Sequence, residues 1–253
     1  VPVQSKLNFD PLDKTMQICK ENGLKMRGHV LAWHAQTPDN FFAENYVAVY
    51  DDPDYKNIIT NRVSKEVMNA RMEWYIKTVL EHVTEWENKN NDGKHIVWAW
   101  DVVNEAIADG NGGGLRTESN WYKIYGSNEF IINAFRYANK YAPKDVILCY
   151  NDYNEYETAK MNGICNLLDA IIAKENDTTL PTRIDAMGMQ AHASVNIPAS
   201  TIETAIKKYI AKGLDIHVTE LDIATEVENN QTTLAKRYKE YYNVYLKYRK
   251  TSA

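Results

Sequence analysis

Short apolar segments alternate with longer amphipathic segments along most of this chain, and this alternation limits the possible folds more than any other feature. Five segments have the character of strands: residues 26–33, 96–104, 146–152, 186–192 and 215–223. They are nearly continuous apolar runs, which is typical of strands buried on both faces of a parallel sheet. Strands that alternate with helices in this way predict a parallel α/β protein.

Several of the intervening helices have clear boundary signals. Asp10 followed by Pro11 predicts a capped helix start, and Gly23 predicts its end. Residues 71–86 carry an apolar face at helical spacing. That face consists of Met72, Ile76, Val79, Val83 and Trp86.

The last two helices are predicted from a cap and from a row of aromatic residues. Ser200 and Glu203 have the spacing of a capping box, and Gly213 predicts the end of that helix. A row of tyrosines near the end of the chain could stack on sugars, but helical spacing favours a face that packs on the core. The row contains Leu234, Tyr238, Tyr241, Tyr245 and Tyr248.

The choice within the α/β class is between an open doubly wound sheet and a closed (β/α)8 TIM barrel. An open sheet of the nucleotide-binding kind would have a glycine-rich phosphate turn after its first strand. The only glycine cluster, residues 110–114, lacks that pattern and is interpreted as a flexible loop. A barrel domain typically has about 250 residues. The sequence therefore predicts one barrel domain over residues 1–253, with the segments 34–64 and 105–127 as active-site loops.

Composition and charge argue against several classes of partner. The net charge of −5 is unlike the dense basic surface of a nucleic-acid-binding protein. The chain contains no run of about 18 apolar residues, so a transmembrane helix is not predicted. The three cysteines lack metal-ligand spacing and are interpreted as buried thiols.

Polar side chains gather where the predicted strands end. In a barrel, the carboxyl ends of the strands form the face that carries the active site. Two acidic residues in these positions, Glu105 and Glu220, would be costly to bury unless they were paired or functional. The other candidates at strand ends are His29, Trp33, Gln36, Asn104, Asn151, Tyr153, Gln190, His192 and Asp222.

This set of side chains suits chemistry on sugars. Two carboxyl groups can serve as acid/base and nucleophile at an acetal carbon, amides bind hydroxyl groups, and aromatic rings stack on pyranose rings. Any one carboxylate could instead be a salt-bridge partner or a helix cap, but polar side chains recur at the carboxyl ends of all five predicted strands. The chain has no H-E-x-x-H or Cys/His cluster and no G-x-S-x-G, so neither a metal site nor a serine nucleophile is predicted.

Five segments in order, RGHVLAWHAQTP, WDVVNEAI, CYNDYN, GMQAH and HVTELDI, resemble the signature segments of glycoside hydrolase family 10, the endo-β-1,4-xylanases. The resemblance extends from about Leu7 to the end of the chain. It implies a (β/α)8 barrel and hydrolysis with retention of anomeric configuration, without a cofactor.

The resemblance also implies roles for individual residues. Glu105 matches the family's acid/base and Glu220 its nucleophile. Asn104 matches the amide that contacts the sugar 2-hydroxyl, and His192 matches a histidine beside the nucleophile with Asp222 behind it. The remaining matches line the substrate subsites: His29, Trp33, Gln36, Asn151, Tyr153 and Gln190.

The implied substrate is xylan or xylo-oligosaccharide, and a polymer outside the cell implies secretion or surface display. A related β-1,4-glucanase and a non-catalytic carbohydrate-binding fragment remain as alternatives. The sequence contains about five of the eight strands of the family barrel. Five strands cannot close an eight-stranded barrel, so we expect further segments or another chain to complete it.

Overall fold

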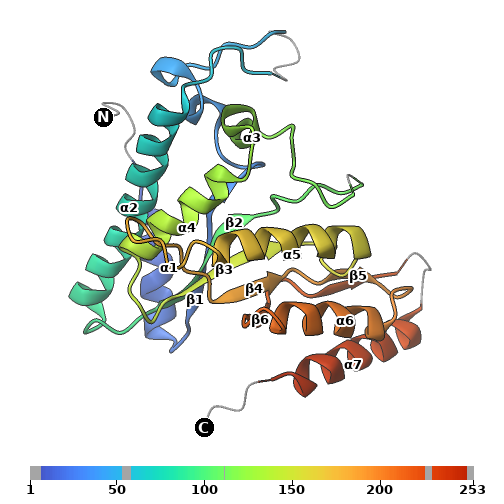
Figure 1. Ribbon diagram of the computed structural model, residues 1–253. Helices are drawn as coiled ribbons and strands as arrows, with labels where there is room; N and C mark the ends of the chain where they lie inside the picture. Colours follow the sequence, from blue (N-terminus) through green and yellow to red (C-terminus); the bar gives the residue numbers. More distant parts are fainter. Residues whose placement is uncertain (1–6, 53–57, 111, 226–229, 250–253) are drawn as a thin grey trace.

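The computed structural model describes residues 7–52, 58–110, 112–225 and 230–249. Five parallel strands within these ranges form one sheet in the order β1-β2-β3-β4-β6 (Figure 1). The strands are β1 (Met26–Trp33), β2 (Val97–Asn104), β3 (Ile147–Asp152), β4 (Ala186–Met189) and β6 (Asp215–Val218). Every strand of this sheet lies within a segment predicted as a strand, and the parallel α/β class is confirmed.

Helices connect successive strands of the sheet, as the alternation in the sequence predicts. The helix α4 packs against β2 and β3, and α6 packs against β6. None of the helices in the described ranges is long and apolar enough to cross a lipid bilayer. The helices are α1 (Asp10–Glu21), α2 (Lys65–Asn90), α3 (Asn120–Tyr125), α4 (Glu129–Tyr141), α5 (Thr158–Ile172), α6 (Ala199–Ile210) and α7 (Gln231–Lys247).

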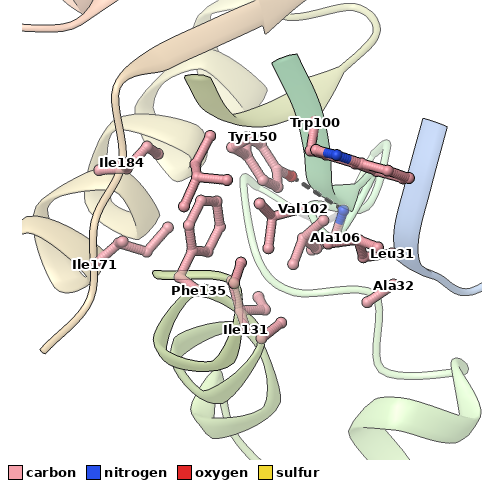
Figure 2. Packing of buried hydrophobic residues seen from close by; sticks show 14 of the residues in the cluster. Leu31, Ala32, Trp100, Val102, Ala106, Ile131, Phe135, Tyr150, Ile171 and Ile184 are labelled. Carbon is pink, nitrogen blue, oxygen red and sulfur yellow. Dashed lines mark hydrogen bonds between the residues drawn. The ribbon is translucent and has the colours of Figure 1, made fainter. Parts of the chain in front are cut away.

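The main core lies between the helices and the sheet (Figure 2). Phe135 of α4 and Tyr150 of β3 are fully buried in it. The Tyr150 hydroxyl also accepts hydrogen bonds from the backbone N–H groups of Ala106 at 3.0 Å and Ile107 at 3.3 Å. This buried phenol therefore fixes the backbone just after β2, where a candidate catalytic residue lies.

Two predicted strands are interrupted, which corrects the sequence-based boundaries. Residues 186–192 divide into β4 and β5 (His192–Ser194), because the chain turns at Ala191 with a φ of 59°. Residues 215–223 divide into β6 and β7 (Asp222–Ala224). The short strands β5 and β7 pair with each other in parallel, so both segments leave the main sheet at the same place.

Two predicted helix caps are wrong. Phe9 is the N-cap of α1, and Asp10 is the first helical residue. At α6 the N-cap is Pro198, and Ser200 already lies inside the helix. The Glu203 carboxylate does not reach back to the helix start because it is engaged elsewhere. Its Oε1 accepts from Lys247 Nζ and from Tyr248 Oη of α7, both at 2.6 Å.

Other boundary predictions are confirmed or extended. The helix predicted over residues 71–86 starts earlier, because the Ser64 hydroxyl accepts a hydrogen bond from Val67 N at 3.4 Å and caps α2. In the tyrosine row of α7, Tyr241 is fully buried, as expected for a core face. The single-domain prediction for residues 1–253 stays a prediction, since its ends, 1–6 and 250–253, lie outside the described residues.

The segment between β1 and α2 is long but has structure of its own. It contains two short 3-10 helices, η1 (Asp39–Phe41) and η2 (Glu44–Tyr46), followed by isolated antiparallel bridges. The Arg71 guanidinium of α2 donates to the backbone oxygens of Phe41 at 2.7 Å and Ala43 at 2.9 Å. This buried arginine therefore holds the segment against α2.

Candidate active site

Glu105 follows directly after β2 and has an unusual backbone. Its φ is 55°, a left-handed conformation that costs a residue with a Cβ on the order of 1 kcal/mol or more. Its N–H donates to the Asn151 backbone oxygen of β3 at 2.9 Å, and Tyr150 holds the next two amides. The surrounding structure thus fixes the direction in which this side chain leaves the strand.

The Glu105 carboxyl group is half-buried and accepts hydrogen bonds from two neutral donors. Trp33 Nε1 donates to Oε2 at 3.0 Å, and Gln190 Nε2 donates to Oε1 at 2.9 Å. Neither donor carries a charge. The two hydrogen bonds hold both carboxyl oxygens of Glu105 in fixed positions.

Glu220 lies just after β6, on a more exposed part of the same site. Its side chain is 38% exposed. Asn151 Nδ2 donates to Oε1 at 3.0 Å, and His192 Nε2 lies 3.2 Å from Oε2. One neutral amide and one imidazole therefore hold the two carboxylate oxygens.

Three amide side chains, which we call the amide bridge, connect the two glutamates. They are Asn104, Asn151 and Gln190, all almost completely buried. The Asn104 Oδ1 accepts from Asn151 Nδ2 at 3.0 Å and from Gln190 Nε2 at 3.1 Å. Since Gln190 also binds Glu105 and Asn151 also binds Glu220, the hydrogen bonds run without a break from one carboxyl group to the other.

A glycine in β4 makes room for this bridge. A Cβ added to Gly188 would lie 2.4 Å from Asn151 Oδ1. That oxygen also accepts from the Thr219 hydroxyl at 2.8 Å, so the amide cannot move away without losing a hydrogen bond. Glycine at position 188 therefore leaves the space that the Asn151 side chain occupies in the site.

His192 and Asp222 meet because both interrupted strands continue as β5 and β7. The two residues are paired in register, and His192 Nδ1 lies 3.0 Å from Asp222 Oδ2. Partial burial lowers the pKa of His192, but the hydrogen bond and charge of Asp222, together with Glu220, outweigh it and raise the pKa overall. Asp222 thus orients the ring so that its other nitrogen faces Glu220.

His29 is positioned in the same manner by a residue that the sequence reasoning missed. Its Nδ1 lies 3.0 Å from Oδ2 of Asp101, a buried residue of β2 that is also ion-paired with Arg27. The hydrogen bond to Asp101 raises the pKa of His29 despite its partial burial. A carboxylate in the middle of an otherwise apolar strand was the signal that could have identified Asp101.

Trp33, Gln36 and His29 line a pocket of about 400 Å³. Gln36 itself is exposed. The other walls come from β1, from the segment after it and from α2. They include four partly exposed aromatic rings, which can stack on sugars, and the buried Trp121. The four partly exposed rings are those of Phe41, Tyr46, Trp74 and Tyr75.

Tyr153 lies on the other side of Glu105, against the loop that follows β2. Its hydroxyl donates to Asp109 and accepts from Arg116 Nη2 at 3.2 Å. Arg116 Nε also donates to the Glu105 backbone oxygen at 3.2 Å. Arg116 was not predicted as a site residue, because no strand end or motif marks it in the sequence.

The glycine-rich part of this loop was predicted to be flexible. Gly110 and Gly112 are exposed, but Gly113 packs against α5. A Cβ on Gly113 would lie 2.3 Å from the Ala159 backbone oxygen, and one on Gly163 would lie 2.0 Å from the Gly113 oxygen. Lys160 Nζ lies 2.8 Å from Asp109 Oδ1 and anchors the loop from the same helix. Asn111 lies outside the described residues.

Within the parts of the chain that the structure describes, no group of three or more His, Cys, Asp or Glu side chains is arranged to hold a metal ion. The three cysteines are free thiols; Cys19 and Cys149 are buried and Cys165 is half-buried.

Comparison with known proteins supplies the family. The family model for glycosyl hydrolase family 10 matches residues 1–253. The chain belongs to this family. Its five-stranded parallel sheet is accordingly part of the (β/α)8 barrel of glycosyl hydrolase family 10, which confirms the predicted fold class.

Curated family 10 relatives are named as xylanases. The chain is 40% identical over 238 residues to a bifunctional endo-1,4-beta-xylanase of Ruminococcus flavefaciens, which covers 93% of this chain and 22% of the relative. It is 38% identical over 245 residues to a putative endo-1,4-beta-xylanase of Caldicellulosiruptor saccharolyticus, covering 93% of this chain and 70% of the relative.

Solved family 10 structures give the same result. The CBM22–GH10 part of a Clostridium thermocellum xylanase, complexed with xylohexaose, superposes with a TM-score of 0.81 at 32% identity. The match covers 100% of this chain and 49% of that one. This family 10 chain therefore spans about a fifth of the first curated relative and about half of the first solved structure.

Proposed function

We propose that this chain provides the catalytic site of a retaining endo-1,4-β-xylanase. The observation that carries the proposal is the amide bridge, which holds Glu105 and Glu220 in one hydrogen-bonded assembly. Two carboxyl groups fixed on one site are what double displacement at an acetal carbon needs. The xylanase names of the relatives support the choice of substrate.

In the first step, Glu220 attacks the anomeric carbon and Glu105 donates its proton to the leaving oxygen. The bond between Glu220 and the sugar forms as the glycosidic bond breaks. Asn151 and His192, which hold the two oxygens of Glu220, orient the carboxylate for attack. The product of this step is a covalent glycosyl-enzyme and a free sugar end.

In the second step, the Glu105 carboxylate takes a proton from water, which attacks the same carbon and releases Glu220. Formation of the ester removes the charge of Glu220, and this loss of a nearby negative charge makes Glu105 a stronger acid. Trp33 and Gln190 hold Glu105 in place through both steps. The reaction uses water and side chains and needs no cofactor.

We propose further that His29, Trp33 and Gln36, which line the aromatic pocket, bind sugars on one side of the cleaved bond. Asn104, Asn151, Gln190 and His192 would contact the sugar at the bond itself, and Tyr153 would lie on the side of the Arg116 loop. The ligands named for relatives, xylohexaose and xylotetraose, support an extended substrate.

Reducing-sugar release by the intact protein tests this function. We expect release from xylan and much less from mixed-linkage glucan or cellulose. Faster release from glucan would make the protein a β-1,4-glucanase. Binding of xylan without any release, in a folded protein with both glutamates intact, would favour a non-catalytic carbohydrate-binding role.

We also propose that the protein acts outside the cell, since polymeric xylan cannot enter it. Detection of the protein in the medium or on the cell surface of its source would support this. An exclusively cytosolic protein would contradict it and would point to imported xylo-oligosaccharides as the substrate.

A further inference from the structure

A carboxyl group behind the active site is fully buried without a hydrogen-bond partner. Glu155 has 0% exposure, and neither of its carboxyl oxygens has a partner among the described residues. An ionised carboxylate in this position would have lost its hydration with little to replace it, at a cost of several kcal/mol. Geometry alone therefore indicates that Glu155 is held as the neutral acid.

The Glu155 side chain lies where two site-bearing segments run together. The backbone oxygen of Asp152 accepts from Gln190 N at 3.0 Å, and the Tyr156 hydroxyl donates to the His192 oxygen at 3.1 Å. Glu155 lies between these two links in sequence. The backbone amides of Ala191 and of Glu155 itself lie near its carboxyl group but outside hydrogen-bond geometry. The residues on both sides of Glu155 are thus tied to the residues on both sides of Ala191.

Ala191 needs such support because its backbone is strained. Its φ is 59°, in the left-handed region, and its side chain is fully buried. This conformation allows Gln190 to point to Glu105 while His192 points to Glu220. We call residues 190–192 the Ala191 corner. If the corner relaxed, both candidate catalytic carboxyl groups would lose a hydrogen-bonding partner.

We propose that Glu155 is a positioning residue, which as a neutral carboxyl group holds the Ala191 corner and through it Glu105 and Glu220. The effect on activity rests on the proposed xylanase function, whereas the protonation state of Glu155 does not. When Glu155 loses its proton, the buried charge favours opening of the corner toward water, and activity falls.

Several groups near Glu155 determine the pH at which it loses its proton. Asp152 of β3 and Lys160 of α5 oppose each other, since Lys160 Nζ lies 3.0 Å from Asp152 Oδ1. The remaining neighbours are tyrosine hydroxyls, which are neutral. Burial, helped by Asp152, raises the pKa of Glu155 to about 8 although backbone amides and Lys160 act in the opposite direction. The tyrosines are Tyr156, Tyr209 of α6, and Tyr241 and Tyr245 of α7.

The raised pKa of Glu155 makes the stability of the fold depend on pH. A carboxyl group with a pKa raised in the folded state stabilises the protein fully below its unfolded pKa, and this contribution is lost as pH rises through about 8. Burial also raises the pKa of Asp152, to about 6. His29 and His192, whose pKa values are raised from 6.5, also titrate above pH 6. The difference between wild type and Glu155→Gln therefore isolates the contribution of Glu155.

The first test is Glu155→Gln in the intact protein, which keeps the shape and remains neutral at every pH. The matched control is Glu157→Gln, which removes an exposed carboxylate two residues away. An aryl xylobioside with a dinitrophenol leaving group is the substrate, because its cleavage does not need the proton of Glu105. We expect kcat/KM of Glu155→Gln within about threefold of wild type at pH 6. Above pH 8, the ratio of variant to wild type should rise about tenfold per pH unit.

Two further measurements do not depend on catalysis. In a Glu105→Gln background, which removes the proton of the general acid, the infrared spectrum at pH 7 should contain the carbonyl band of a protonated carboxylic acid. Adding Glu155→Gln should remove this band, and adding Glu157→Gln should leave it unchanged. The pH slope of unfolding between about pH 6 and 7.5 should differ between wild type and Glu155→Gln by about one proton, and the difference should disappear above pH 9. Both results, the infrared band and the pH slope of unfolding, are expected even if the protein hydrolyses a different substrate.

Absence of the protonated band at pH 7 in folded Glu105→Gln would overturn the proposal. So would pH profiles of wild type and Glu155→Gln that superimpose up to pH 9.5. If Glu155→Gln does not fold, the titration of the infrared band in Glu105→Gln decides alone, and a midpoint below pH 6 would refute the neutral acid.

Discussion

Glu220 contributes more to the proposed chemistry than to the stability of the fold. Its side chain is more than a third exposed, and its two contacts are side chains that keep other partners. We therefore expect Glu220→Ala to lower turnover of xylan by a factor on the order of 10⁴ to 10⁶. The free energy of unfolding should change by no more than about 1 kcal/mol.

Added azide should rescue this variant and give a glycosyl azide of inverted configuration, because azide then occupies the place of the nucleophile. Glu81→Ala, which removes an exposed carboxylate of α2, is the control and should keep wild-type turnover. Turnover of Glu220→Ala near the wild-type level would remove Glu220 from the role of nucleophile.

The contact between His192 and Asp222 should influence both the pKa of the histidine and the pH dependence of stability. The pKa of His192 is raised chiefly by Asp222 against a lowering effect of burial, so Asp222→Asn should lower it. A raised histidine pKa stabilises the fold below the unfolded pKa, and the contribution is lost as pH rises through the folded pKa. Asp222→Asn should therefore reduce stability at pH 5 more than at pH 9.

Titration of the histidine resonances by NMR measures this effect directly. Asp145→Asn is a matched control. Asp145 lies 3.1 Å from His95 and raises its pKa, so this substitution should lower the pKa of His95 and leave that of His192 unchanged. An unchanged His192 titration in Asp222→Asn would show that the β5–β7 contact does not act on the ring in solution.

At the scale of elements, the loop after β2 depends on two glycines. Gly163→Ala would place a Cβ 2.0 Å from the Gly113 backbone oxygen, and backbone cannot rotate away as a side chain can. We expect a loss of about 1–3 kcal/mol in stability from this overlap, partly offset by the better helix propensity of alanine. Activity should fall as well, since Arg116 in this loop contacts Glu105.

Chemical denaturation and kcat/KM measure the two effects. Asn166→Ala, at an exposed position of the same helix, isolates the gain in helix propensity and should be neutral or slightly stabilising. If Gly163→Ala were as stable and as active as Asn166→Ala, the loop would not be held by this close approach.

The elements also show which features the sequence could predict. Apolar runs such as residues 146–152 identified the strands well, because burial on both faces requires continuous apolar sequence. The turn at Ala191 was missed because its left-handed backbone is imposed by tertiary contacts and not by a glycine. The predicted Ser200–Glu203 cap is wrong for a similar reason, since Lys247 of a distant helix binds the Glu203 carboxylate.

For the site, sequence order placed Glu105 and Glu220 at strand ends, and parallel strands bring such ends together. Asp101 and Arg116 were not predicted, because their contacts cross between segments that no local pattern connects. The family resemblance added the roles of individual residues, which spacing alone does not provide.

At the scale of the whole molecule, the sheet has two edges within the described residues. Both β1 and β6 pair on one side only. Large apolar side chains are exposed at the β6 edge: Val218 of β6 is 38% exposed, and Leu246 of α7, which lines the same hollow, is 41% exposed. Exposed edges and apolar surface favour association. We expect both edges to pair with further strands in the intact protein.

Expression of residues 1–253 alone tests this expectation against the intact protein as control. The shorter chain should bind a hydrophobic dye and associate, as judged by light scattering after gel filtration. A stable, monodisperse monomer with rapidly exchanging backbone amides in β1 and β6 would contradict the expectation.

The amide bridge also has a consequence for the chemical ageing of the protein. Hydrolysis of the Asn104 or Asn151 side chain would replace a neutral amide by a carboxylic acid at a buried position, and asparagine is among the residues most sensitive to prolonged heat. At Asn151, the new group would replace the amide that donates to Glu220. We expect Asn151→Asp to fold yet to lose most of its turnover, which kinetic assays and circular dichroism would show together. Protein stored warm would then lose activity in proportion to deamidated peptide found by mass spectrometry, while its melting curve still reported a folded enzyme.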